Sequence, residues 1–150
     1  RGPRSNYADR KTGSYLGRYA TTVDAMVEEQ IHPQTYGDHQ DLRELTLTNA
    51  QSHTSLNIQV GGHVSFSLSH YDESTWTNNP RSLWSTDTHW YDLKRQPQVY
   101  AHFDYWQRGL GNNSCGGDTC LSQYQCPTSG SYTYTLRFQP SVASTPTLGD

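Results

Sequence analysis

Alternation of apolar and polar residues at every second position restricts the fold of this 150-residue chain more than any other feature. Val64, Phe66 and Leu68 alternate with the serines at positions 65, 67 and 69. Successive side chains of a β-strand point to opposite faces, so this period predicts a strand with one buried side. The serines are expected on its solvent side.

The same period recurs along the chain, and turns rich in Gly, Asn and Ser separate the repeats. Residues 22–30 are predicted either as two helical turns capped by Thr22 or as extended chain, and one helical turn is expected near Pro80–Leu83. Without long helical patterns between the strands, the sequence predicts an all-β fold of antiparallel sheets. The further strands are expected around Leu42–Thr48, Ile58–Val60 before a turn at Gly61 and Gly62, Val99–Trp106 and Tyr132–Phe138.

Composition excludes two classes of partner. The net charge is −3 and no basic run occurs, whereas binding to nucleic acid needs clustered Lys and Arg. No apolar run approaches the roughly 20 residues that span a bilayer, so no membrane partner is expected. Hydrophobic residues make up only 32%, which favours a sheet with wide polar faces or a part that takes core from neighbouring sequence. Because the first residue is Arg1, we expect the chain to come from a longer one.

The three cysteines, Cys115, Cys120 and Cys126, do not indicate a metal site. Their C-x4-C-x5-C spacing differs from that of zinc ligands, and no His follows at ligand spacing. A Cys120–Cys126 disulfide and free loop thiols both remain open, and the compartment stays undetermined between cytoplasm and periplasm.

No catalytic arrangement can be derived from spacing. Adjacent Glu28 and Glu29 do not face each other on a helix or a strand, and Asp38 followed by His39 is typical of a polar turn. His63 and His70 flank the serine-rich strand and are expected to face solvent or form hydrogen bonds. The tryptophans are either sugar-stacking surfaces or core, namely Trp76, Trp84, Trp90 and Trp106.

The segment from Gln107 to Asp118 is rich in glycine and carries polar residues at its tip. Glycines permit left-handed backbone, so the segment is either a loop that presents side chains to a ligand or a long hairpin connection.

Ordered motifs resemble the C-terminal region of family 2 β-galactosidases. The resemblance covers about 140 residues, in family order. The blocks are GPRSNYADR at 2–10, HPQTYGDHQDLRELTLTN at 32–49, FSLSHYDESTW at 66–76, THWYDL at 88–93, HFDYWQRGLGNNSCGGD at 102–118 and SYTYTLRFQP at 131–140.

This resemblance implies the C-terminal half of a galactose mutarotase-like supersandwich over residues 1–140, followed by a flexible tail or linker at 141–150. It also implies a retaining β-galactosidase whose two catalytic glutamates lie in a (β/α)-barrel outside this chain. We therefore expect no catalytic residue, metal ligand or cofactor here, and any Mg or Na that the parent enzyme uses is expected to be bound elsewhere in it. The parent is expected to be bacterial and oligomeric, with its remaining domains as partners of this chain.

The resemblance further implies that the loop at 107–118 reaches the mouth of the active site. Cys115 stands where well-known members have a sugar-binding Trp, and Ser5 stands where the signature has Glu. We expect Cys115, with Asn112, Asn113 and Ser114, to contact β-galactoside or galactose. The alternative function is a carbohydrate-binding β-sandwich module without a hydrolase role.

Overall fold

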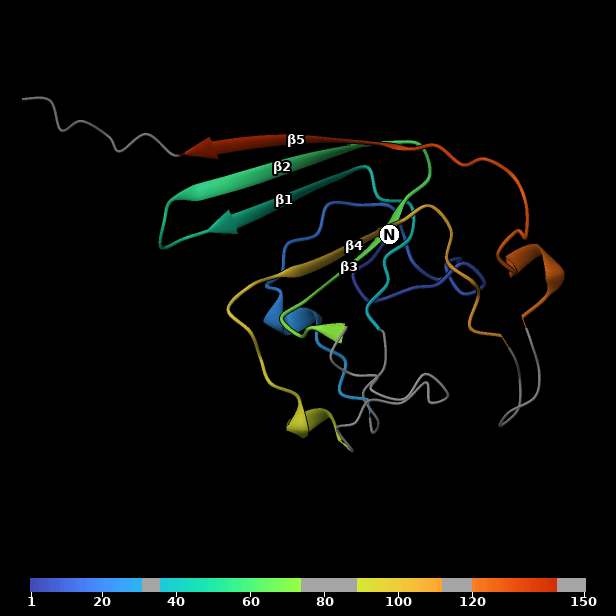
Figure 1. Cartoon of the computed structure of the whole chain (residues 1–150), viewed down its shortest axis with the longest axis horizontal. Coiled ribbons are helices and arrows are strands. Elements are labelled where there is room, and N and C mark those ends of the chain that lie inside the picture. Colours follow the sequence, from blue (N-terminus) through green and yellow to red (C-terminus); the bar gives the residue numbers. More distant parts are fainter. Residues whose placement is uncertain (31–35, 74–88, 112–119, 143–150) are drawn as a thin grey trace, which may run out of the picture.

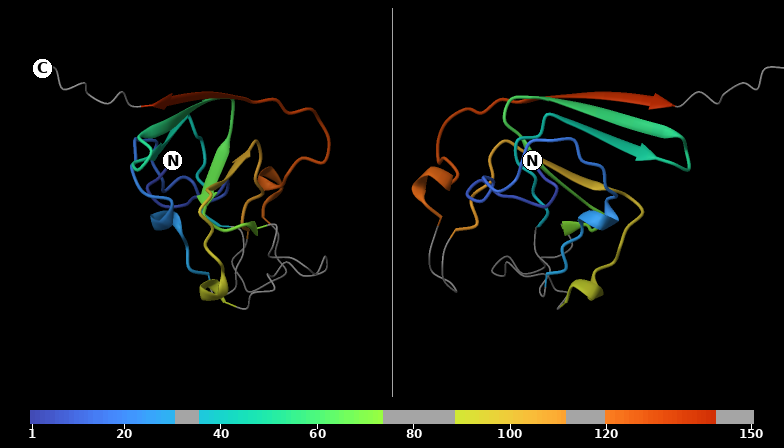
Figure 2. Two further views of the ribbon diagram at one scale, coloured as in Figure 1. Left: turned by 60° about the vertical axis from the view of Figure 1, so that its left-hand side comes forward. Right: turned by 180° about the vertical axis from the view of Figure 1, so that it is seen from behind.

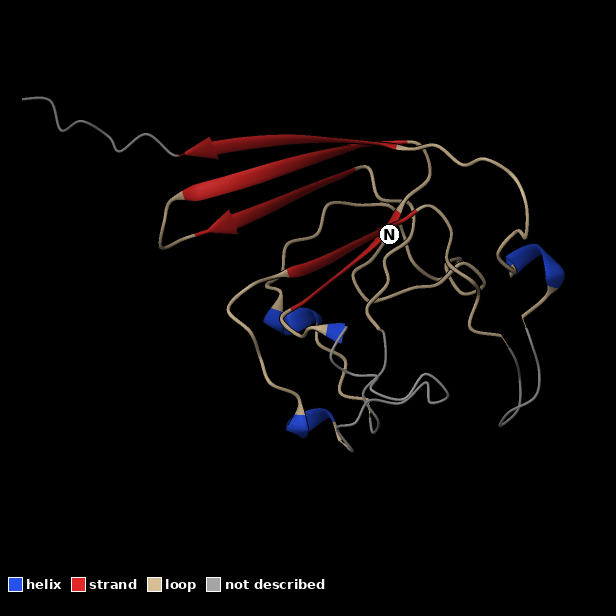
Figure 3. Ribbon diagram, viewed as in Figure 1, coloured by secondary structure: helices blue, strands red, loops and turns tan. Residues whose placement is uncertain are grey.

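The computed structural model describes residues 1–30, 36–73, 89–111 and 120–142. Its strands are antiparallel and form two sheets, which confirms the predicted all-β class (Figures 1 and 3). The helices in the described parts are single 3-10 turns, and none of them is long and apolar enough to cross a membrane. They are η1 (Asp24–Met26), η3 (Trp90–Asp92) and η4 (Ser122–Tyr124).

The larger sheet has the order β1-β2-β5. Residues paired across antiparallel strands share a face. Ile58 on β2 lies opposite Leu45 and Phe138, so the apolar side chains of the three strands gather on one face of this sheet. The strands are β1 (Glu44–Asn49), β2 (Thr54–Gly61) and β5 (Thr135–Val142).

The smaller sheet pairs β3 (Ser65–Ser69) with β4 (Tyr100–Asp104). Figure 2 shows it below the larger sheet, and the chain passes from one sheet to the other after Gly62, whose φ is +107°. On the other edge of β3, His39 and Phe66 form an isolated bridge with two backbone hydrogen bonds of 2.8 and 3.1 Å. Residues 38–42 therefore act as a short third strand.

The prediction that the β3 serines face solvent is wrong. Ser65, Ser67 and Ser69 are 4, 8 and 7% exposed, as buried as Leu68 on the other face. The η1 turn packs beside β3, and residues 38–42 pair with its free edge, so neighbouring segments of the chain surround this strand. A two-residue period reports which side chains share a face, but not what covers that face.

Several predicted boundaries also change. Of residues 22–30 only η1 is helical, and the Thr22 hydroxyl accepts a hydrogen bond from the Ala25 N–H at 3.2 Å. The last strand begins at Thr135 and continues through Pro140 to Val142, two residues into the predicted tail. Proline is tolerated there because β5 is an edge strand. The turn expected at Pro80–Leu83 and the tail beyond 142 lie outside the described residues.

The apolar core is small in the parts of the chain that the structure describes. Its most buried side chain is Ile58, at 1% exposure. Among these described residues the exposed large apolar side chains outnumber the buried ones, so apolar surface is left for contact with other sequence. The buried set is Tyr36, Leu42, Ile58, Val64, Leu68 and Cys120.

Candidate functional site

The N-terminal segment is joined to residues 38–40 by the buried side chain of Asn6, which is 2% exposed. The Asn6 N–H donates to the Asp38 carbonyl at 2.7 Å, and its Oδ1 accepts from the Gln40 N–H at 3.1 Å. Its Nδ2 donates to the Arg1 carbonyl at 3.2 Å. Because one amide satisfies backbone groups on both segments, it fixes the first motif block against the second.

Asp9 and Arg10, from the same first block, hold the start of the glycine-rich loop. The Asp9 carboxylate accepts from the Leu110 N–H at 3.1 Å and from the Gly111 N–H at 2.9 Å. The Arg10 guanidinium donates to the Gly111 carbonyl. Hydrogen bonds to a charged partner are stronger than neutral ones, so the pair fixes the backbone immediately before residue 112.

Gly109 shows why the loop base requires glycine. A Cβ at this position would lie 2.7 Å from Asp9 Cγ and 3.0 Å from Tyr124 Cβ. The Gly109 N–H also donates to the Tyr124 carbonyl at 2.9 Å, which joins the loop base to η4. Gly111 has a φ of +81°, a left-handed conformation that favours glycine.

Asp38 is the most deeply buried ionisable side chain near the loop base, at 1% exposure. Gln40 Nε2 donates to its carboxylate at 2.5 Å. With the Gln107 amide nitrogen turned toward it, Gln107 donates at 2.6 and 3.0 Å. Burial raises the pKa of Asp38 from 3.8 to about 6 and the Asp104 carboxylate adds to the rise, whereas Gln40 opposes it. Asp38 thus holds two glutamine amides in place.

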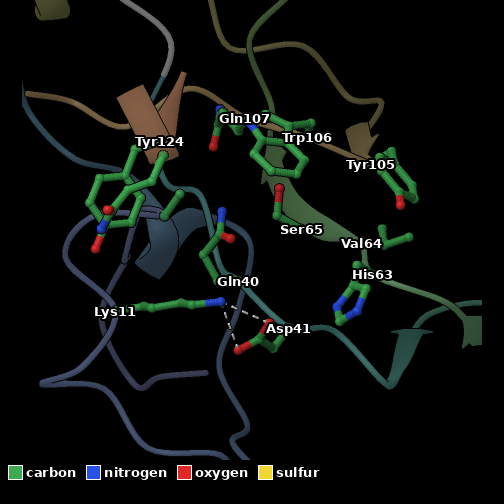
Figure 4. A pocket seen from close by; sticks show the side chains of 12 residues that line it. Lys11, Gln40, Asp41, His63, Val64, Ser65, Tyr105, Trp106, Gln107 and Tyr124 are labelled. Carbon is green, nitrogen blue, oxygen red and sulfur yellow. Dashed lines mark hydrogen bonds and ion pairs between the residues drawn. The ribbon is translucent and has the colours of Figure 1, made fainter. Parts of the chain in front are cut away.

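A cavity of about 300 Å³ lies beside this cluster (Figure 4). Gln40, Ser65 and Gln107 belong to its wall, so the neighbours of Asp38 face an open space. Lys11 Nζ lies 3.2 Å from the Asp41 carboxylate, which also binds Arg1 Nε at 2.6 Å. The remaining lining side chains are Ala8, His63, Val64, Tyr105, Trp106, Gln123 and Tyr124.

The predicted substrate-binding residues Asn112, Asn113, Ser114 and Cys115 lie outside the described residues. The structure does describe both ends of their loop. It enters through Gly111, and it leaves at Cys120, which is 4% exposed and donates its thiol to the Tyr124 carbonyl at 3.4 Å. Cys120 and Cys126 are both free thiols, so the loop-thiol alternative holds for this pair.

The two histidines behave as predicted. His63 is exposed, and His70 is buried with its Nδ1 2.7 Å from the Gln98 carbonyl oxygen. Within the described ranges, no group of three His, Cys, Asp or Glu side chains is placed to hold a metal ion.

Sequence reasoning missed three residues that organise the site: Asn6, Asp9 and Asp38. Asp38 and His39 were expected in a polar turn, but both are buried. The signal that could have found Asn6 and Asp9 is the first motif block itself, because its polar residues contact the two later blocks.

Comparison with known proteins now decides the family. The sequence profile described as "Beta galactosidase small chain" matches residues 1–138. The chain belongs to the β-galactosidase small chain family. This membership confirms the resemblance seen in the motif blocks.

Individual β-galactosidases are similar to this small chain over most of its length. That of Staphylococcus xylosus is 30% identical over 116 residues, 77% of this chain and 11% of the relative. That of Priestia megaterium is 29% identical over 140 residues, 93% of this chain and 13% of the relative. For Streptococcus thermophilus the identity is 24% over 139 residues. The small chain therefore spans between a tenth and a seventh of these relatives' length.

Proposed function

We propose that this small chain is the non-catalytic C-terminal part of a retaining β-galactosidase, where it shapes the mouth of the active site. The observation that carries the proposal is a pair of hydrogen bonds at the base of the loop. The Asp9 carboxylate accepts them from the Leu110 and Gly111 N–H groups, at 3.1 and 2.9 Å. These two hydrogen bonds hold the backbone of Leu110 and Gly111, which directly precede residues 112–115 in the sequence. A fixed approach is what a side chain needs to contact substrate in one orientation.

The substrate contacts in this proposal are made by Cys115 and Asn113, with Asn112 and Ser114 beside them. The replacement of Cys115 by Ala in the full-length enzyme should then change KM or acceptor preference more than stability. Cys126→Ala is the matched control, because Cys126 is an exposed free thiol outside the loop. Unchanged kinetics in a Cys115→Ala, Asn113→Ala double variant would refute the site-shaping role.

The second part of the proposal is support of assembly with the remaining domains of an oligomeric bacterial enzyme. Phe138 and Val142, on the apolar face of the larger sheet, are 53 and 73% exposed. Contiguous exposed apolar surface of this kind marks an interaction site. The proposal includes no cofactor bound by this chain, and any Mg or Na that the enzyme uses would be held by other domains.

The test measures galactoside hydrolysis by a variant of the parent enzyme from which residues 1–140 of this chain have been deleted. The rate is compared before and after the small chain is added as a separate polypeptide. We expect activity to be lost on deletion and restored on addition. If activity never falls, the small chain is a dispensable module rather than a part of the catalytic assembly.

A carbohydrate-binding module remains the alternative function. One observation favours it: the two described tryptophans, Trp90 and Trp106, are 37 and 44% exposed and so present aromatic surface to solvent. Trp106 also lines the cavity, whereas Trp90 does not.

A further inference from the structure

We propose that Asp38 and Gln107 form a proton-linked switch at the base of the glycine-rich loop, in which the Gln107 amide turns over when the Asp38 carboxyl gains or loses a proton. The switch joins residues 38–42 to the chain that enters the loop through Gly111. It is a property of the 150-residue chain itself, so it does not depend on the function proposed above.

The contact between Asp38 and Gln107 fits two arrangements of hydrogen bonds. One amide atom of Gln107 lies 2.6 and 3.0 Å from the two carboxyl oxygens. If this atom is Nε2, it donates to an ionised carboxylate, and if it is Oε1, it accepts the O–H of a neutral carboxylic acid. A half turn of the terminal amide exchanges the two arrangements with little movement of the heavy atoms. Each protonation state of Asp38 therefore selects one orientation of the amide.

Gln40 and Ser65 can bind Asp38 in either state. Gln40 Nε2 donates to Asp38 Oδ2 at 2.5 Å, and the Ser65 hydroxyl is hydrogen-bonded to the same carboxyl. A protonated carboxyl keeps acceptor capacity besides its one O–H donor, so it can accept from Gln40 while it donates to Gln107. Neither state leaves the buried carboxyl without partners, and only the Gln107 amide has to turn.

The surroundings of the two side chains differ in a way that suits a switch. Asp38 is 1% exposed, so a change in its charge must be met by its hydrogen-bonding partners rather than by water. Gln107 belongs to the wall of the cavity, next to Trp106 in Figure 4. The cavity measures about 300 Å³, whereas a water molecule occupies about 30 Å³. The amide therefore has open space beside it in which to turn.

Opposing influences place the proton of Asp38 within the range of ordinary buffers. Burial has the largest influence and raises the pKa of Asp38 from 3.8 to about 6. Hydrogen bonds from Gln40 and Ser65 lower this pKa, and the nearby Asp104 carboxylate on β4 raises it. The carboxyl therefore changes from neutral to ionised as pH rises through about 6, and the amide is expected to turn over in the same interval.

Other titratable groups lie around Asp38 and the cavity. Burial raises the pKa of the Tyr7 hydroxyl above 10, so this neighbour stays neutral. Burial lowers the pKa of His39 and also that of the Arg1 α-amino group, which interacts with the Asp38 charge. The further charged or titratable side chains at the cavity are the Arg1 guanidinium, Lys11, Asp41 and His63.

The test is nuclear magnetic resonance of the nitrogen-isotope-labelled 150-residue chain between about pH 4.5 and about pH 8. Gln40 and Gln107 both approach Oδ2 of Asp38, at 2.5 and 2.6 Å. We therefore expect a nuclear Overhauser cross-peak between the two Nε2 groups above about pH 6, and its loss below that pH, where the Gln107 nitrogen has turned away. Asp38→Asn should abolish this transition.

Asp104→Asn and Asp24→Asn form a matched pair of controls. The Asp104 carboxylate raises the pKa of Asp38, so Asp104→Asn should move the midpoint of the transition to lower pH. Asp24 is exposed and is paired with Arg95 at 2.8 Å. Asp24→Asn removes the same charge at the surface, where water screens it, and should leave the midpoint in place.

Three results would overturn the proposal. The first is a Gln107 amide whose signals do not change over the pH range. The second is a cross-peak that persists at both ends of the range, because the amide then does not turn. The third is a transition that survives in Asp38→Asn, which would assign the proton to another group such as His39 or His63. If Asp38→Asn fails to fold, an unchanged midpoint in Asp104→Asn overturns the assignment to Asp38.

Discussion

In β3, every residue but Phe66 is buried, and its serines are as inaccessible as its leucine. In β5, every residue but Leu136 is exposed, including Phe138 and Val142. The two strands have similar alternation in sequence but opposite surroundings. Cover for β3 comes from within the small chain, through η1 and residues 38–42. The apolar face at β5 lacks such cover in the described residues.

The difference separates two kinds of stabilisation. Polar contacts to backbone and buried amides hold the region around β3, with Asn6 and Asp38 at its centre. The larger sheet relies on apolar contact, and only Ile58 is fully removed from solvent. Directional hydrogen bonds fix the conformation of the region around β3. The larger sheet keeps an exposed apolar face, which is suited to burial against another surface.

The largest expected effect is at Ile58. Ile58→Ala deletes a side chain that is 1% exposed at the centre of the β1-β2-β5 sheet. Such truncations cost about 2–5 kcal/mol of unfolding free energy, because lost burial and the new cavity add. Urea unfolding followed by fluorescence measures this cost. Ile58→Val is the graded control, at about 0.5–1.5 kcal/mol. A cost below that of the control would show that this sheet has no core of its own.

Replacement of Asp38 is expected to raise the free energy of unfolding at neutral pH, whereas replacement of Ile58 lowers it. Its pKa in the folded chain is about 6, above its ordinary value of 3.8, so the folded state holds the proton more tightly than the unfolded one. The contribution of Asp38 to stability is therefore fully present below about pH 3.8 and is lost as pH rises through about 6. Asp38→Asn removes the buried charge but keeps an amide that can bind Gln40 and Gln107. It should stabilise the chain at pH 7 by about 1–3 kcal/mol and flatten the profile between pH 4 and 6.

Asp41 provides the control for that experiment. Although burial raises its pKa, hydrogen bonds from Arg1 and Lys11 lower it below the ordinary value. Asp41→Asn should therefore destabilise the chain at neutral pH, with the loss disappearing as the wild-type carboxyl is protonated in acid. Unfolding curves at pH 7 and below pH 3.8 compare the two variants. If both substitutions stabilised the chain at pH 7, or both destabilised it, then the buried Asp38 and the ion-paired Asp41 would not differ in their contribution to stability.

The next effect concerns the loop base. In Gly109→Ala the new methyl group would meet Asp9 Cγ at 2.7 Å, and overpacking of this kind costs about 1–3 kcal/mol. If the loop also shapes an active site, KM in the full-length enzyme should rise with it. Gly13→Ala is the matched control because no atom lies within 4 Å of its Cβ, so it should be neutral or slightly stabilising. Equal effects of the two alanines would remove the argument for a fitted loop base.

The sequence predicted the antiparallel strands because their period is local, and Leu45, Ile58 and Leu68 lie in strands where it placed them. It missed the buried serines and Asp38 because their cover comes from segments far along the chain, such as His39 beside Phe66. For the candidate site it predicted the glycine-rich segment. It did not predict the hydrogen bonds from the Leu110 and Gly111 N–H groups to the Asp9 carboxylate, which join residues 101 and 102 positions apart. Polar contacts over such separations leave no periodic signal in one sequence.

The smallest effect in the chain alone is expected at Phe138, which lies opposite Ile58 in the register but is 53% exposed. Phe138→Ala should cost less than about 1 kcal/mol in the 150-residue chain, since little burial is lost. In the assembled enzyme the same change should cost more, because a partner that covers the apolar face would bury the ring. Arg137→Ala, on the other face of β5, is the control and should be neutral in both settings. The comparison is made by urea unfolding of the isolated chain and by complementation of the enzyme lacking residues 1–140. If Phe138→Ala complements as well as Arg137→Ala, the apolar face is not the surface through which the small chain joins its partner.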